Sequence, residues 1–368
     1  MDEDNYLEAK RAGYDLINEA RTSLGLHPLQ YDAQLSLLAS EHCKEMATQG
    51  YLSHFDLKGR PPFRRYFEGG VPHHVEEALW EKDAPEGEEW DPEDAAAQRA
   101  LVEEGVRAFF AQEEPADYEK RVVLGERHTH VALGAWLAAG GRRFRLAAVA
   151  ADAYLQLEPV APELHAHEVM LEGRCAPGWG PYGALVYYSR LADPPALEEL
   201  RAGGALGGGG GGAGGGGAGG GYDDYTDHQL AMVWPWDMEY RDPEAGAALP
   251  GGTFALPLQF KTLDPGHYYV KVFVKENPGT IPYQEYQGGL QLPGEDTVCA
   301  GALVLTVPLP SSPGGTTLLT HDGAPVRARP GAAPLSAAGD DATAMTLDTL
   351  QSLVGEAGTP EEKQARAQ

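Results

Sequence analysis

The histidines that lie close together in the chain are the first candidates for chemistry. His73 and His74 are adjacent, and one residue separates His165 from His167. Because alternate residues of a strand point to the same side, His165 and His167 would share one face. A zinc site needs three or four nitrogen, sulfur or oxygen ligands. Neither pair has a cysteine or a further histidine at metal-site spacing, so we predict that these are surface histidines.

The cysteines are the second candidates. Cys43, Cys175 and Cys299 are far apart, odd in number and form no Cys-x-x-Cys pair. This pattern favours buried, reduced thiols in a cytosol-like compartment over a disulfide framework. The sequence assigns no histidine partner to any of them and contains no Gly-x-Ser-x-Gly motif. Hydrolysis by a nucleophilic side chain therefore has no support from the sequence.

The elements that must position any site begin with helices. Apolar spacing predicts a helix over about residues 6–24, and a second one between Asp32, a plausible N-cap, and Gly50. An acidic stretch over residues 76–104 precedes a third helix that includes Val102 and Phe110. Strands follow at 131–137 and 144–150, separated by a Gly-Gly turn. The first part of the chain is therefore predicted to be α+β.

A long run of this first part is similar to the CAP superfamily, which includes cysteine-rich secretory, antigen, pathogenesis-related and bacterial SCP-like proteins. The matching positions are Asn18, Arg21, Gly25, Leu26, Pro28, Leu29, Asp32, Leu35, Ala39, His42, Met46, Gly50, Ser53 and His54, followed by Gly59 and by Arg64 or Arg65. A weaker match follows at Phe110, Glu113, Thr129, His130, Val131 and Gly134. The resemblance covers roughly residues 5–157 and implies an α-β-α sandwich with a cleft.

In many CAP proteins two histidines and two glutamates converge in that cleft and bind a divalent metal. The resemblance places His54 at the first histidine, Glu77 at the first glutamate with Glu76 as the competing register, and Glu113 at the second glutamate. The second histidine falls near Tyr118, which departs from the pattern. We therefore predict no catalytic residues and no cofactor. A divalent metal such as zinc, held by His54, Glu77 and Glu113, is the alternative.

The remaining chain has two parts. Residues 158–310 contain short strand-like runs separated by turn signals, which predicts an immunoglobulin-like β-sandwich, and a glycine-rich stretch at 203–221 is predicted to be a loop insertion. Strand candidates lie at 168–171, 184–188, 230–233, 254–260, 267–275 and 302–307. Residues 311–368 are predicted to be a flexible tail with a short amphipathic helix at 341–355. The domain boundaries that we predict are 1–157, 158–310 and 311–368.

The charge balance narrows the function. With 28 basic and 55 acidic residues the net charge is −27, which argues against nucleic acid as a partner. The sequence contains no stretch of 18 apolar residues and therefore predicts no transmembrane helix. The acidic start of the chain lacks the apolar region of a signal peptide. We therefore expect a cytoplasmic location. We predict a non-enzymatic intracellular binding or scaffold protein with protein partners, within a cytoskeletal or ciliary assembly. The alternatives are a CAP protein that binds a sterol or another lipid, and a metal-dependent hydrolase.

Overall fold

The computed structural model describes residues 6–113, 118–191, 194–202, 228–233, 239–241, 252–260, 263–276 and 297–308. The glycine-rich stretch at 203–221 and the predicted helix at 341–355 lie outside the described residues. Within the described part, no helix is both long and apolar enough to cross a bilayer.

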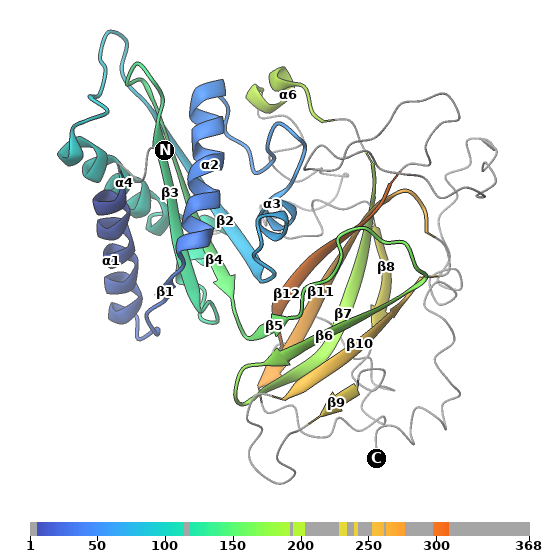
Figure 1. Cartoon of the computed structure of the whole chain (residues 1–368). Coiled ribbons are helices and arrows are strands. Elements are labelled where there is room, and N and C mark those ends of the chain that lie inside the picture. Colours follow the sequence, from blue (N-terminus) through green and yellow to red (C-terminus); the bar gives the residue numbers. More distant parts are fainter. Residues whose placement is uncertain are drawn as a thin grey trace, which may run out of the picture.

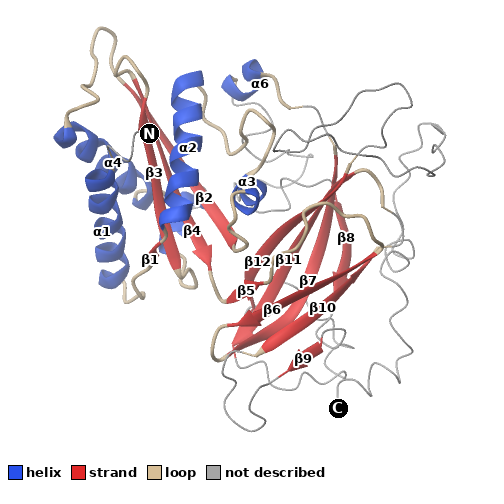
Figure 2. Ribbon diagram, in the orientation of Figure 1, coloured by secondary structure: helices blue, strands red, loops and turns tan. Residues whose placement is uncertain are grey.

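The first part of the chain holds helices and one sheet (Figures 1 and 2). Its elements are α1 (Leu7–Ser23), β1 (Gln30–Tyr31), α2 (Ala33–Gln49), α3 (Pro62–Glu68), β2 (His74–Asp83), α4 (Ala95–Phe110), α5 (Tyr118–Leu124), β3 (His130–Leu137) and β4 (Arg143–Asp152). The predicted bounds of α2 are confirmed, since the Asp32 carboxylate accepts the Leu35 N–H at its start and Gly50 takes a left-handed conformation at its end.

The sheet of this part has the order β1-β3-β4-β2, with β1 parallel to β3 and the other pairs antiparallel. Helices α2 and α3 share a core with one face of the sheet, and α1, α4 and α5 share a second core with the other face. The α-β-α layering that the resemblance implies is therefore present. Gly134 lets α2 approach closely, because a Cβ atom there would lie 2.3 Å from the Ala39 carbonyl carbon.

Strand β2 corrects the reading of residues 76–104 as one acidic stretch before a helix. Its ten residues pair with β4 along their whole length, with Glu77 opposite Val149. Acidic residues are depleted in strands, so the local sequence does not predict this strand. Its carboxylates are held by partners from distant segments, such as Arg65 for Glu77 and Arg145 for Glu81.

The second part holds two four-stranded sheets with the orders β5-β6-β10-β9 and β12-β11-β7-β8. The strands are β5 (Leu155–Leu157), β6 (Glu168–Cys175), β7 (Trp179–Arg190), β8 (His228–Val233), β9 (Glu239–Arg241), β10 (Thr253–Gln259), β11 (Gly266–Glu276) and β12 (Thr297–Val307), with α6 (Leu197–Arg201) after β7. Apolar side chains of both sheets form one core. The predicted sandwich is present, and its immunoglobulin-like classification stays a prediction.

The outer face of the second sheet packs against the first part of the chain. Alternation along β11 places Tyr268 and Val270 in the sandwich core, whereas Tyr269 and Phe273 join the core of α2 and α3. The Phe63 ring of α3 meets the Tyr269 ring edge to face, with 4.5 Å between centroids. Figure 1 shows α3 beside this sheet. The two parts therefore share one continuous core.

Candidate functional site

The candidate site is centred on Glu77, in the middle of β2. Its side chain is fully buried, and its Oε2 atom lies 3.1 Å from Nδ1 of His54. His54 lies in the segment after α2, and its side chain is only 13% exposed. The structure thus brings together two of the three residues that the resemblance selected.

The other oxygen of Glu77 is bound by α3. Nη2 of Arg65 lies 2.5 Å from Oε1, and the Tyr66 hydroxyl donates to the same oxygen at 2.8 Å. Pro62 occupies the first turn of this short helix, where proline is favoured because its ring sets a helical φ. Arg65 also donates to the His54 carbonyl at 2.9 Å. Both oxygens of the carboxylate are therefore occupied by groups of the chain itself.

The electrostatics of the site keep Glu77 ionised. Burial alone would raise the pKa of Glu77, but the charge of Arg65 and the hydrogen bond from His54 outweigh it, so its pKa lies well below the ordinary value. His42 of α2 faces the same group of charges. Burial and the Arg65 charge lower the pKa of His42 to about 3, so its ring is neutral and its Nε2–H donates to the Ser53 carbonyl at 2.9 Å.

The competing register is resolved by the pleat of β2. Glu76 points to the opposite face of the sheet from Glu77, as the strand period requires. There its carboxylate lies 3.6 Å from Nε2 of His74 and 3.6 Å from Nε2 of His128. Glu77 is therefore the carboxylate that faces His54.

The third predicted residue lies apart from this pair. Glu113 follows α4 and is exposed. Near His54 the structure instead places Tyr118, whose ring lies edge to face with the imidazole, 6.4 Å between centroids. The resemblance had placed the missing second histidine near Tyr118. Among the described residues, no three His, Cys, Asp or Glu side chains form a group that could hold a metal ion.

Among the described residues, His54 and Glu77 therefore lack a third protein ligand for a divalent metal. A cation at Oε2 of Glu77 would have to break the contact with His54, and it would lie close to the Arg65 guanidinium, which carries a like charge and is itself buried. Glu77 is also a poor general base, because a carboxylate with a strongly lowered pKa has little tendency to take a proton near neutral pH. The arrangement is instead a buried, hydrogen-bonded ion pair that fixes α3 on the sheet.

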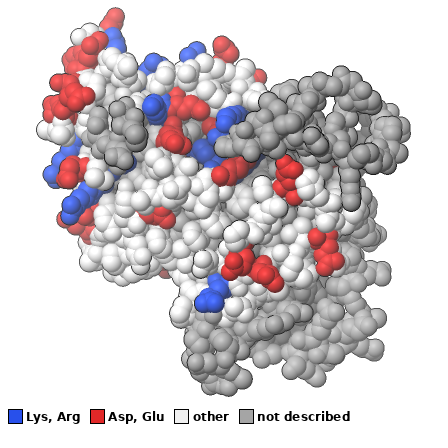
Figure 3. Space-filling model, in the orientation of Figure 1, with Lys and Arg blue, Asp and Glu red and all other residues white. Residues whose placement is uncertain are grey.

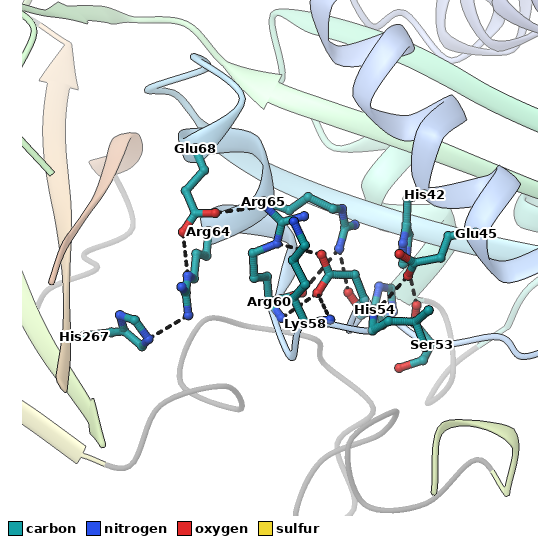
Figure 4. A network of polar contacts seen from close by, with 12 residues as sticks. His42, Glu45, Ser53, His54, Lys58, Arg60, Arg64, Arg65, Glu68 and His267 are labelled. Carbon is teal, nitrogen blue, oxygen red and sulfur yellow. Dashed lines mark hydrogen bonds and ion pairs between the residues drawn. The ribbon is translucent and has the colours of Figure 1, made fainter. Parts of the chain in front are cut away.

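A chain of polar contacts leads from this site to the second part of the molecule (Figure 4). Arg60 contacts Glu68 at 2.9 Å, Glu68 contacts Arg64 at 2.7 Å, and Nη1 of Arg64 donates to Nε2 of His267 on β11 at 2.6 Å. Burial and the Arg64 charge lower the pKa of His267 to about 4. The neutral ring then donates its Nδ1–H to Thr306 at 3.0 Å.

Sequence reasoning missed the two α3 residues that bind Glu77. In the stretch that matches the CAP pattern, Arg65 was only one of two adjacent arginines that could fit one position. Nothing in the sequence pattern pointed to Tyr66. The expectation that His74 lies on the surface is wrong, because this residue is only 8% exposed.

The surface carries mixed charge: on the face in Figure 3, acidic and basic side chains lie beside one another over the first part of the chain.

A comparison with protein families agrees with the resemblance, because the model "Cysteine-rich secretory protein family" (CAP) matches residues 14–143. Among solved structures, an outer surface protein from Borrelia burgdorferi is similar with 17% identity and a TM-score of 0.31, over 40% of this chain and 94% of that one. An extracellular SCP-domain protein from Bacillus anthracis has 21% identity and a TM-score of 0.26, over 39% and 40% of the two chains. No curated protein matches.

Proposed function

We propose that this chain, whose residues 14–143 match the CAP family, is a non-enzymatic protein that binds other proteins inside the cell. The observation that carries the proposal is the state of Glu77. Its fully buried carboxylate is bound by Arg65, Tyr66 and His54, so the residues that could have supplied metal or acid–base chemistry serve the fold instead.

The joint between the two parts supports a scaffold role. A scaffold must hold its binding surfaces in a fixed relation, and here one hydrophobic core includes α2, α3 and the outer face of the β12-β11-β7-β8 sheet. We propose that the second part is an immunoglobulin-like sandwich and that it presents its surface together with the CAP domain as one unit. We further propose that the protein acts inside the cell, within a cytoskeletal or ciliary assembly.

Native mass spectrometry of the protein, isolated gently from its own source, tests this function. We expect a complex with the added mass of a further polypeptide, and we expect His54→Ala to retain it. A bare monomer would contradict the proposal. So would an adduct with the mass of a zinc ion or of a sterol, because these would support the hydrolase or the lipid-binding alternative.

A further inference from the structure

A pocket lies where segments from both parts of the chain come together. It encloses about 400 Å³, which is within the range of small-molecule sites, about 300–1,000 Å³. It shares no residue with the Glu77 site. Its lining residues are Glu126 and Arg127 from the loop between α5 and β3, Tyr154 between β4 and β5, Trp179 at the start of β7, and Lys275 and Glu276 at the end of β11.

Hydrogen bonds and strand pairing hold the walls of this pocket in place. The Tyr154 hydroxyl donates to the Arg127 carbonyl at 2.6 Å, which fixes the loop beside the ring. The Ala176 N–H donates to the Tyr154 carbonyl at 2.7 Å, and the Trp179 N–H donates to the Ala176 carbonyl at 3.0 Å. The pairing of β7 with β11 places Glu276 opposite Trp179. The pocket is therefore formed by the fold itself.

Two aromatic rings supply the apolar part of the lining. The rings of Tyr154 and Trp179 lie 4.1 Å apart between centroids, and their planes are tilted by 37°. Both residues are half-buried and pack against the sandwich core. The face of an aromatic ring carries partial negative charge, so it attracts C–H groups, which are weakly positive. A ligand with a face of C–H groups can therefore pack on these rings.

Four charged side chains complete the lining, and their charges balance. Glu126 and Glu276 supply two carboxylates, and Arg127 and Lys275 supply two cations. The carboxylates can only accept hydrogen bonds and the cations can only donate them, whereas a hydroxyl group does both. A charged ligand would meet a like charge here, and an apolar ligand would take charged groups out of water without a partner. The lining therefore favours an uncharged ligand with several hydroxyl groups.

We propose that this pocket binds a neutral monosaccharide. The C–H face of the sugar ring packs on Tyr154 and Trp179, and the hydroxyl groups hydrogen-bond to Glu276 and to the other charged side chains of the lining. This activity goes beyond the proposed binding of proteins and does not depend on it. Because a monosaccharide has few atoms, its Kd should be on the order of 1 mM.

Tryptophan NMR on the full chain tests the site. The indole N–H signals are followed while glucose, galactose, mannose or N-acetylglucosamine is added, each in a separate titration to about 50 mM, well above the expected Kd. The Trp179 signal is assigned by its loss in Trp179→Phe. We expect at least one of these sugars to shift the Trp179 signal saturably. The signal of Trp90, which lies outside the pocket, should not move.

Two matched variants separate binding in the pocket from a general effect of the sugar. Glu276→Ala should raise the Kd about tenfold, as the loss of a hydrogen bond to a charged group does. Glu172→Ala, at an exposed glutamate of β6, is the control and should leave the Kd unchanged. Both glutamates are exposed, so both variants should fold. The proposal is overturned if none of the sugars shifts the Trp179 signal saturably, or if Glu276→Ala binds the sugar as tightly as the wild type.

Discussion

The guanidinium of Arg65 lies 2.5 Å from the carboxylate of Glu77, one of the residues that the CAP resemblance had implied as metal ligands. Both side chains are buried, at 6% and 0% exposure. Taking two charges out of water is costly unless they are paired and hydrogen-bonded, and here Tyr66 and His54 complete the pairing. The ion pair links α3 to β2, and Phe63 of α3 in turn packs against Tyr269 of the sandwich.

Removing the charge of Glu77 should destabilise the protein strongly. Glu77→Gln leaves the Arg65 guanidinium buried without its counter-charge, which costs about 3–5 kcal/mol of unfolding free energy. Urea unfolding at pH 7 measures it. The matched control is Glu113→Gln, the other predicted glutamate, which is exposed and should change stability by less than about 0.5 kcal/mol. Equal effects of the two variants would refute the structural role of Glu77.

The same ion pair predicts how stability depends on acid. Because the pKa of Glu77 is lower in the folded protein than in the unfolded chain, its contribution is fully present above the unfolded value of about 4.3. That contribution is lost as the pH falls through the folded pKa. The stability gap between wild type and Glu77→Gln should therefore narrow below about pH 4. Urea unfolding at several pH values checks this, and a gap that widens in acid would contradict it.

The His267 imidazole should titrate far below an ordinary histidine. Burial and the Arg64 charge lower its pKa to about 4, so NMR should show a neutral ring, protonated at Nδ1, throughout the physiological range. Arg64→Gln removes the charge and should move the midpoint upward. The NMR signals of the His165 ring, whose side chain is 67% exposed, are the control and should be the same in the variant and in the wild type. An unchanged His267 midpoint in Arg64→Gln would mean that the contact between α3 and β11 is not formed.

The packing of the first part of the chain against the sandwich should depend on Phe63. This ring is 3% exposed and packs on Tyr269 across the joint. Phe63→Ala should cost about 3–5 kcal/mol, as core phenylalanine truncations do. Leu37→Ala, at a residue of α2 that is 54% exposed, is the control and should have little effect. Melting temperatures are measured by far-ultraviolet circular dichroism. Equal melting temperatures for the two variants would contradict the claim that the two parts share one core.

Local signals in the sequence were sufficient for several elements of the fold. Asp32 and Gly50 bound α2 because a cap residue and a left-handed glycine act within one turn. The alternation of Tyr268 and Tyr269 identified β11. The sequence could not show that the Tyr269 face is also covered, since that depends on α3, about 200 positions earlier. Strand β2 was missed for the same reason, because its carboxylates are compensated only by distant cations.

The candidate site was predictable only through the family pattern. That pattern selected His54 and Glu77, which lie in contact, and it placed the missing second histidine near Tyr118, whose ring lies edge to face with that of His54. It did not reveal that Arg65 forms an ion pair with the Glu77 carboxylate, because tertiary packing decides which charged side chains meet.

A zinc titration followed by NMR tests the central claim most directly. The His54 ring and the Glu77 carboxyl carbon are observed while Zn²⁺ is added to the full chain up to an equimolar amount. If Glu77 serves the fold through Arg65, neither signal should show a saturable shift, and Glu77 should remain ionised. A one-to-one, saturable shift of both signals would show that His54 and Glu77 bind a metal, and would contradict the account.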